Sequence, residues 1–169
     1  MTKGAREFIE RLGLLAEEQG IPRIGGRMIG YLLLHDEQKS LDQIAEDLQV
    51  SKASISLNGR WLEKLGVVER VGSPGDRRDY YRIADQPWEQ IYAVAQQRLQ
   101  RTHDLLELGL RLLGEEEVVG RRRIKEWQWF YAFMLNDFRT KLERWREFRA
   151  RREAGEAASP EDLAEATGT

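Results

Sequence analysis

The chain has 169 residues, of which 41% are hydrophobic and 33% charged, with four prolines and no cysteine. This composition favours a helix-rich protein with one folding unit over a disordered one. The lack of cysteine excludes disulfides, zinc–thiolate sites and thiol redox sensing. No apolar run approaches the ~20 residues of a membrane span, and the N-terminal residues lack a signal-peptide core. We therefore expect a cytoplasmic protein with no membrane partner.

The net charge of −2 conceals an uneven distribution of charge along the chain. Residues 51–82 carry seven Lys and Arg against four Asp and Glu, whereas residues 1–50 carry six against nine. Because the local field governs attraction to phosphates, the near-neutral total does not exclude nucleic-acid binding. The two histidines, His35 and His103, are far apart on predicted helices. We interpret both as structural or solvated, and we expect no metal and no cofactor.

Two helices are predicted in the first 35 residues. Apolar residues at helical spacing predict a helix over 5–19, which Gly20 and Pro22 end. A second, strongly apolar helix is predicted from about 24 to 35. It contains Gly25, Gly26 and Gly30, each of which costs roughly 1 kcal/mol in a helix interior. Close packing against another helix is the interpretation that we favour for these glycines, and contact with a ligand is the alternative.

The next two predicted helices are short and follow each other closely. Ser40 and Gln43 have the spacing of a capping box, so a helix begins at residue 41. An apolar stripe continues to residue 48, and Ser51 then caps a second helix that runs to Leu65. Gly66 follows as a left-handed helix stop. Two short helices separated by about three residues predict a helix-turn-helix.

A β-hairpin is predicted after this helix pair. Val67, Val68 and Val71 favour one strand, residues 73–76 a turn, and residues 80–83 the returning strand. A hairpin in this position is the wing of a winged helix-turn-helix. Long helices are predicted over 88–113 and about 116–152, and residues 154–169 are expected to be disordered.

The predicted fold is thus mainly α with a small β-hairpin wing. We expect a winged helix-turn-helix over about 22–85, flanked by long dimerisation helices over about 5–19 and 86–152. Together they would make one unit, residues 1–153.

The predicted helix over 52–65 has one apolar and one polar face. At ~100° per residue, Ile55, Leu62 and Leu65 face the core, and Asn58 lies near them, where we expect a structural hydrogen bond. Small polar and basic residues face outward, as an element that enters the major groove of DNA requires. An ordinary solvated face is the alternative. The expected DNA contacts from the helix and its start are Ser51, Lys52, Ala53, Ser54, Ser56, Leu57, Arg60 and Lys64.

The predicted turn of the wing presents two arginines. Arg77 and Arg78 lie between Asp76 and Asp79, whose carboxylates can hold a guanidinium in place. An arginine at a hairpin tip suits a narrow minor groove, whose negative potential attracts it. A surface salt bridge with no role in binding is the alternative.

These residues resemble the MarR family of bacterial regulators. The stretch from Ser73 to Arg78 is similar to the wing signature of that family. The segments 20–34, 51–71 and 74–83, in that order, resemble its GbsR-like branch more specifically. The resemblance covers about residues 5–150. It implies a homodimer on a palindromic operator, with helices in successive major grooves, Arg78 in the flanking minor groove and Asp76 orienting Arg78.

The last predicted helix has an apolar stripe and further aromatic residues outside it. A helix that is apolar on more than one side needs two partners, so we expect one face to pack within the chain and the other against a second copy. A longer monomeric bundle is the alternative. The stripe comprises Ile124, Trp127, Tyr131, Met134, Phe138, Leu142, Trp145 and Phe148; Trp129, Phe130 and Phe133 lie off it.

The resemblance also implies a repressor that a small-molecule effector releases, and the named member of the branch answers to choline and related quaternary ammonium compounds. An aromatic cage binds such cations. Its candidate residues here are Trp127, Trp129, Tyr131 and Phe133. A core role for these aromatic residues is the alternative. For the chain as a whole, the competing function is a winged-helix module for protein assembly. The sequence contains no nucleophile–base pair, metal cluster or phosphate loop that would favour an enzyme.

Overall fold

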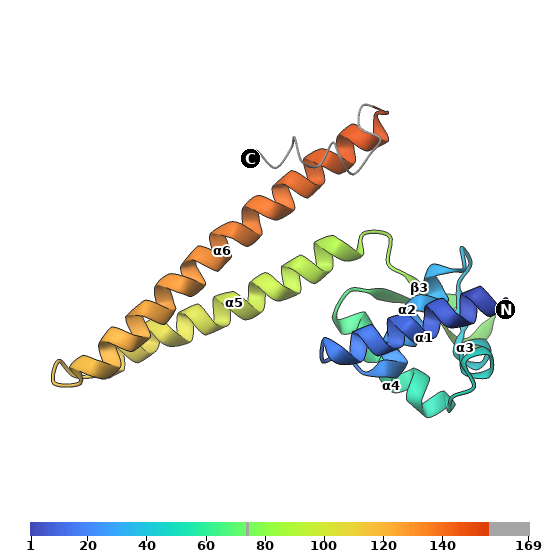
Figure 1. Ribbon diagram of the computed structural model, residues 1–169, viewed down its shortest axis with the longest axis horizontal. Coiled ribbons are helices and arrows are strands. Elements are labelled where there is room, and N and C mark those ends of the chain that lie inside the picture. Colours follow the sequence, from blue (N-terminus) through green and yellow to red (C-terminus); the bar gives the residue numbers. More distant parts are fainter. Residues whose placement is uncertain (74, 156–169) are drawn as a thin grey trace. The chain divides into compact units, whose positions relative to one another are not determined.

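The computed structural model describes residues 1–73 and 75–155, and for Ser73 and Arg77 it describes the backbone alone (Figure 1). The chain divides into two compact units, Met1–Ile91 and Tyr92–Thr169. The elements of the first unit are α1 (Lys3–Glu18), α2 (Arg23–Leu33), β1 (Lys39–Ser40), α3 (Leu41–Leu48), α4 (Lys52–Lys64), β2 (Val68–Ser73) and β3 (Asp76–Ile83). Helix α5 (Pro87–Leu112) begins in the first unit and continues in the second, which also contains α6 (Val118–Glu153).

Helices α1 and α2 pack closely because α2 carries glycine where they touch. A Cβ at Gly26 would meet the Ala16 side chain and lie 2.9 Å from the Leu12 carbonyl oxygen. A Cβ at Gly30 would lie 3.2 Å from the Cα of Ile9. These distances leave no room for a side chain at Gly26 and little at Gly30. For these two glycines the prediction of close helix packing is confirmed.

The helix-turn-helix begins and ends at the residues that the sequence indicates. The Ser40 hydroxyl accepts from the Gln43 amide at 3.2 Å, and the Gln43 side chain accepts from the Ser40 amide at 2.9 Å. The capping box is therefore present in both directions. Ser51 caps α4 by accepting from the Ser54 amide at 3.1 Å, and Gly66 follows with a φ of 74°.

The wing is part of a three-stranded antiparallel sheet with the order β1-β3-β2. The hairpin of β2 and β3 is confirmed. The two-residue strand β1 was not predicted, because two residues are too few to show a period of their own. It pairs Ser40 with Tyr80, so the sheet joins the start of α3 to the wing. An irregularity lies between Val71 and Ser73, beside the turn.

The core of the first unit is formed by apolar side chains from helices α1 to α4 and from the sheet. Met28, Ile44, Ile55 and Leu62 are fully buried, and Tyr81 of β3 packs among them. A Cβ at Gly59 of α4 would lie only 2.7 Å from the Tyr81 ring, so glycine at this position allows the ring to pack against the helix. The core therefore fixes α4 against the sheet, with its opposite face toward solvent.

The second unit contains a pair of helices joined by a short connection. Arg121 of α6 donates to the carbonyl oxygens of Leu110 and Leu113, at 2.8 and 2.7 Å, near the end of α5. The rings of Tyr92 and Phe138 lie 5.3 Å apart between the two helices. No helix in the part of the chain that the structure describes is long and apolar enough to cross a membrane. Of the predicted tail, residues 156–169 lie outside the described residues.

Candidate nucleic-acid interface

Helix α4 presents to solvent the face that the sequence assigns to DNA. Ile55 and Leu62 are fully buried on the inner face, and Asn58 is only 7% exposed. The Asn58 amide donates to the Ser54 carbonyl oxygen at 2.8 Å, a structural hydrogen bond as expected. On the outer face, Leu57 is 65% exposed. At this exposure Leu57 is not part of the core, and its side chain is accessible from solvent.

The start of α4 is already engaged in contacts within the chain. The Ser51 hydroxyl caps the helix and lies 2.8 Å from the Ser54 hydroxyl. The Lys52 ammonium pairs with Asp42 of α3 at 2.9 Å. Both partners of this pair are exposed, so the interaction is weak and can yield to a phosphate. Ala53 is exposed beside them, and Ser54 is half-buried.

The rest of the outer face is polar and basic. Arg60 lies along its own helix, where its Nε donates to the Ser56 carbonyl oxygen at 3.2 Å. Arg60 and Lys64 are exposed, and Ser56 is half-buried. Ala53, Ser56, Leu57, Arg60 and Lys64 therefore share one side of α4, over about three turns, whereas Ser51 and Ser54 lie around the helix from them.

In the wing, one carboxylate holds one arginine. Asp76 accepts from the Arg78 backbone amide at 2.9 Å and from the Arg78 guanidinium, whose Nε lies 2.9 and 3.0 Å from the two carboxylate oxygens. The Arg78 side chain is nevertheless exposed. Hydrogen bonds from Arg78, and a further one from Tyr80, hold the pKa of the Asp76 carboxyl well below its usual range. The carboxylate therefore remains charged at any ordinary pH.

Asp79, the second predicted wing carboxylate, has a partner on the other strand of the hairpin. It pairs with Arg70 of β2 at 3.5 Å. The side chain of Arg77 lies outside the described residues. Tyr80, which donates to Asp76 at 2.8 Å, was not among the predicted site residues. The period of two along a strand places residues 76, 78 and 80 on one face of β3. The sequence prediction missed this because it began the returning strand at residue 80, whereas β3 begins at Asp76.

The four aromatic residues considered for an effector cage do not converge within one chain. Trp127 and Trp129 are two residues apart on α6, which places them ~200° apart around the helix. Both are exposed, as is Phe133. The Lys125 ammonium already lies 5.5 Å from the centre of the Trp129 ring. A single copy of α6 thus offers no enclosed aromatic site for a cation.

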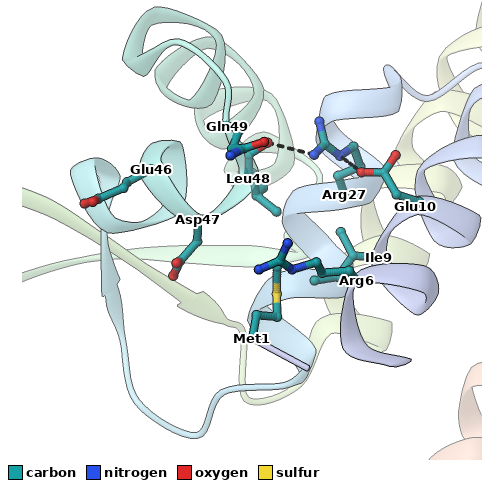
Figure 2. Close-up of a pocket in the computed structure, with 9 residues that line it drawn as sticks. All are labelled: Met1, Arg6, Ile9, Glu10, Arg27, Glu46, Asp47, Leu48 and Gln49. Atoms are coloured by element: carbon teal, nitrogen blue, oxygen red, sulfur yellow. Dashed lines mark hydrogen bonds and ion pairs between the residues drawn. The ribbon is translucent and has the colours of Figure 1, made fainter. Parts of the chain in front are cut away.

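A pocket of about 280 Å³ lies in the first unit, among residues of α1, α2 and the end of α3 (Figure 2). Arg27 joins the three helices: its Nε lies 2.7 Å from a Glu10 oxygen, and it donates to the Leu48 carbonyl oxygen at 2.7 Å. Nearby, the Tyr31 hydroxyl donates to Asp47 at 2.6 Å. None of the described lining residues is aromatic. The pocket is therefore not the cage expected for a quaternary ammonium ion.

Comparisons with known proteins identify the family of this chain. A family model described as an MmpR5-like MarR family transcriptional regulator matches residues 86–151. The HTH-type transcriptional regulator MmpR5 of Mycobacterium tuberculosis (strain ATCC 25618 / H37Rv) is 35% identical over 136 residues, which cover 77% of this chain and 79% of that protein. The chain belongs to the MmpR5-like MarR family. A crystal structure of a transcriptional regulator is similar with a TM-score of 0.77 and 32% identity, over 85% of this chain and 99% of the other.

Membership of the MarR family confirms the prediction of the family and of the winged-helix fold. The finer assignment to the GbsR-like branch is not confirmed, since the matching family model is MmpR5-like. Proteins of this family are transcriptional regulators and not enzymes, as the sequence indicated. The chain is therefore a transcriptional regulator of the MarR type.

Proposed function

We propose that this MarR-type regulator binds double-stranded DNA as a homodimer. Helix α4 enters the major groove with Ala53, Ser56, Leu57 and Arg60 toward the bases. Ser51, Lys52, Ser54 and Lys64 contact phosphates, and the wing places Arg78, beside Arg77, in the minor groove. The observation that supports this proposal most directly is the division of α4 into two faces. The inner face is buried in the core, while Leu57 and the basic residues face solvent.

The homodimer is supported by the apolar surface of the second unit. Trp129, Phe130 and Phe133 of α6 are all more than half exposed. They lie away from the side of α6 that carries Tyr131 and Phe138, which are half-buried within the chain. A helix that keeps such rings in solvent on one side has a second partner. A second copy of the chain would also set two α4 helices about one DNA turn apart, ~34 Å, on a palindromic site.

We propose repression by occupation of the operator as the mode of action. A small molecule that favours a dimer with a different spacing of its α4 helices would release the DNA. If a quaternary ammonium compound is that effector, residues from both copies must build the aromatic site, because α6 alone does not bring its aromatic residues together.

Salt titration of binding to a random-sequence duplex tests the proposed function. We expect the dissociation constant to rise about 10³-fold between 50 and 200 mM salt, the loss typical of about six phosphate contacts. Fluorescence anisotropy with a labelled 30-base-pair duplex measures it. If the folded protein shows no binding even at 50 mM salt, the alternative of a protein-assembly module is favoured instead.

Leu57→Ala is expected to alter the choice of sequence more than the affinity for DNA in general. An apolar contact with a thymine methyl, worth about 1 kcal/mol, would be lost in each of the two half-sites of an operator selected from a random pool. The total of about 2 kcal/mol is a loss of about 30-fold in affinity. Affinity for random duplex would change less than about two-fold. Lys64→Ala is the matched control, since loss of a phosphate contact weakens both complexes equally. Equal losses for Leu57→Ala on both duplexes would contradict base contact.

A further inference from the structure

The turn of the wing contains a second contact on Asp76 beyond that of Arg78. The Tyr80 hydroxyl donates to Oδ2 of Asp76 at 2.8 Å, and the Tyr80 ring lies 5.6 Å from the Arg78 guanidinium carbon. We propose that Tyr80 is a positioning residue for DNA binding, which fixes Asp76 and, through it, the wing arginine Arg78. This inference rests on the proposed function, in which Arg78 enters the minor groove.

The strand geometry explains why these three side chains meet. Residues 76, 78 and 80 alternate along β3 and therefore lie on one face of the strand. Asp76 is the first residue of β3 and pairs with Ser73 beside the turn. Tyr80 lies deeper in the sheet, where its backbone pairs with Ser40 of β1 on one side and Val71 of β2 on the other. The three residues thus extend from the free end of the hairpin to the part of β3 that pairs with a strand on both sides.

The contact from Tyr80 matters because an exposed ion pair alone holds an arginine poorly. Such a pair contributes about 0–1 kcal/mol, since two mobile side chains must be ordered to form it. An arginine that is free in solution loses rotamer entropy of up to about 2 kcal/mol when DNA orders it. The Arg78 backbone amide holds Oδ1 of Asp76, and the Tyr80 hydroxyl holds Oδ2 to the three-stranded sheet, so the carboxylate is fixed through both oxygens. Arg78 is then ordered before DNA arrives, and binding loses less entropy.

The arrangement leaves the arginine accessible. Arg78 and Tyr80 together line a hollow of about 460 Å³, with Lys39 of β1 and Gln43 of α3 among the other lining residues. More than half of the Arg78 side chain is exposed, whereas only a quarter of Asp76 is. The carboxylate thus lies behind the guanidinium that it orients. Asp76 and Tyr80 act through Arg78 and need not touch DNA themselves.

A double-mutant cycle separates positioning from a general structural role. Duplex affinity is measured for the full chain, for Tyr80→Phe, for Arg78→Ala and for the double variant, on the same selected operator. We expect a loss of about ten-fold for Arg78→Ala and about three-fold for Tyr80→Phe, which keeps the ring and removes only the hydroxyl. In the Arg78→Ala background, Tyr80→Phe should have no further effect. An equal three-fold loss in both backgrounds, or no loss in either, overturns the proposal.

Two further variants complete the design. Asp76→Asn should also abolish the effect of Tyr80→Phe, because the hydroxyl acts through the carboxylate. A persistent effect in that background would show that Tyr80 contacts DNA or supports the sheet directly. Tyr92→Phe, which removes a hydroxyl from the second unit, is the matched control and should leave affinity unchanged. Thermal melting verifies that each variant is folded. If the wild-type chain binds no duplex, the proposed function is wrong. If the wild-type chain binds but the effects of Tyr80→Phe and Arg78→Ala are independent, only the role of Tyr80 is wrong.

Discussion

Trp129→Glu combined with Phe133→Glu is expected to produce a monomer at concentrations at which the wild-type chain is a dimer. The two side chains are 65% and 66% exposed in the single chain and lie one turn apart on α6. Burial of each in an interface contributes about 1.5–3 kcal/mol, and two-fold symmetry doubles the number of sites. Four glutamates at that surface are charged and need solvent. We therefore expect the dimer dissociation constant to rise at least about 100-fold, as measured by sedimentation over a concentration series.

The control for this variant places the same charge elsewhere in the second unit. Gln96 and Gln97 of α5 are exposed and polar, so Gln96→Glu with Gln97→Glu adds two glutamates per chain without removing apolar surface. That protein should remain dimeric. A dimeric Trp129→Glu, Phe133→Glu variant would show that the interface lies on another surface. A monomeric wild-type chain would contradict the homodimer altogether.

The loss of the dimer should also weaken DNA binding. A monomer contacts only one half-site of the operator. In a dimer, binding of one α4 helix raises the effective concentration of the other α4 helix at the second half-site, and a monomer loses this gain. On a palindromic operator we expect the loss to exceed that of any single substitution on α4. On random duplex the loss of affinity should be smaller. This difference separates the effect of losing the dimer from a general repulsion between the added glutamates and DNA.

The two helices of the helix-turn-helix were predictable because the limits of each have a local cause. The capping box at Ser40, the cap at Ser51 and the left-handed Gly66 fix the limits of α3 and α4 through hydrogen bonds and φ angles within a few residues. The burial of Ile55 and Leu62 follows from helical spacing alone. Local signals of this kind are sufficient to identify the outward face of α4.

Contacts between separate elements were not predictable in the same way. The pairing of Lys52 with Asp42 depends on how α3 and α4 pack, and neither residue signals the other in sequence. Strand β1 exists because Ser40 lies beside Tyr80 in the folded sheet. On α6, the sequence showed that aromatic residues are numerous. The sequence also separated the apolar stripe that contains Phe138 from Trp129 and Phe133, which lie off it. Only the structure shows that Trp127 of the same stripe is exposed, whereas Phe138 packs against Tyr92.

Glycine at position 26 is where close packing should be most sensitive to substitution. Gly26→Ala is expected to destabilise the protein by about 1–3 kcal/mol, because overpacking there outweighs the gain in helix propensity of about 1 kcal/mol. The new Cβ would lie against the Ala16 side chain, 2.9 Å from the Leu12 carbonyl oxygen and 3.0 Å from the Cα of Gly13. The last two atoms belong to the backbone of α1 and cannot rotate away. Gly26→Val should cost more, since it adds two methyl groups to the same contact.

Gly4→Ala is the control that separates the effect of close packing from the general effect of replacing glycine in a helix. Gly4 also lies in a helix, α1, but a Cβ there meets nothing within 4 Å. The same substitution should therefore leave the free energy of unfolding unchanged or raise it by up to about 1 kcal/mol. Thermal melting would show Gly26→Ala lowering the midpoint by several degrees and Gly4→Ala not lowering it. If both variants melt like the wild-type chain, α1 and α2 do not pack as closely as the structure has them. Glu10 of α1 pairs with Arg27 of α2, which donates to the Leu48 carbonyl oxygen at the end of α3. Gly26→Ala should therefore also weaken the contact between Arg27 and α3.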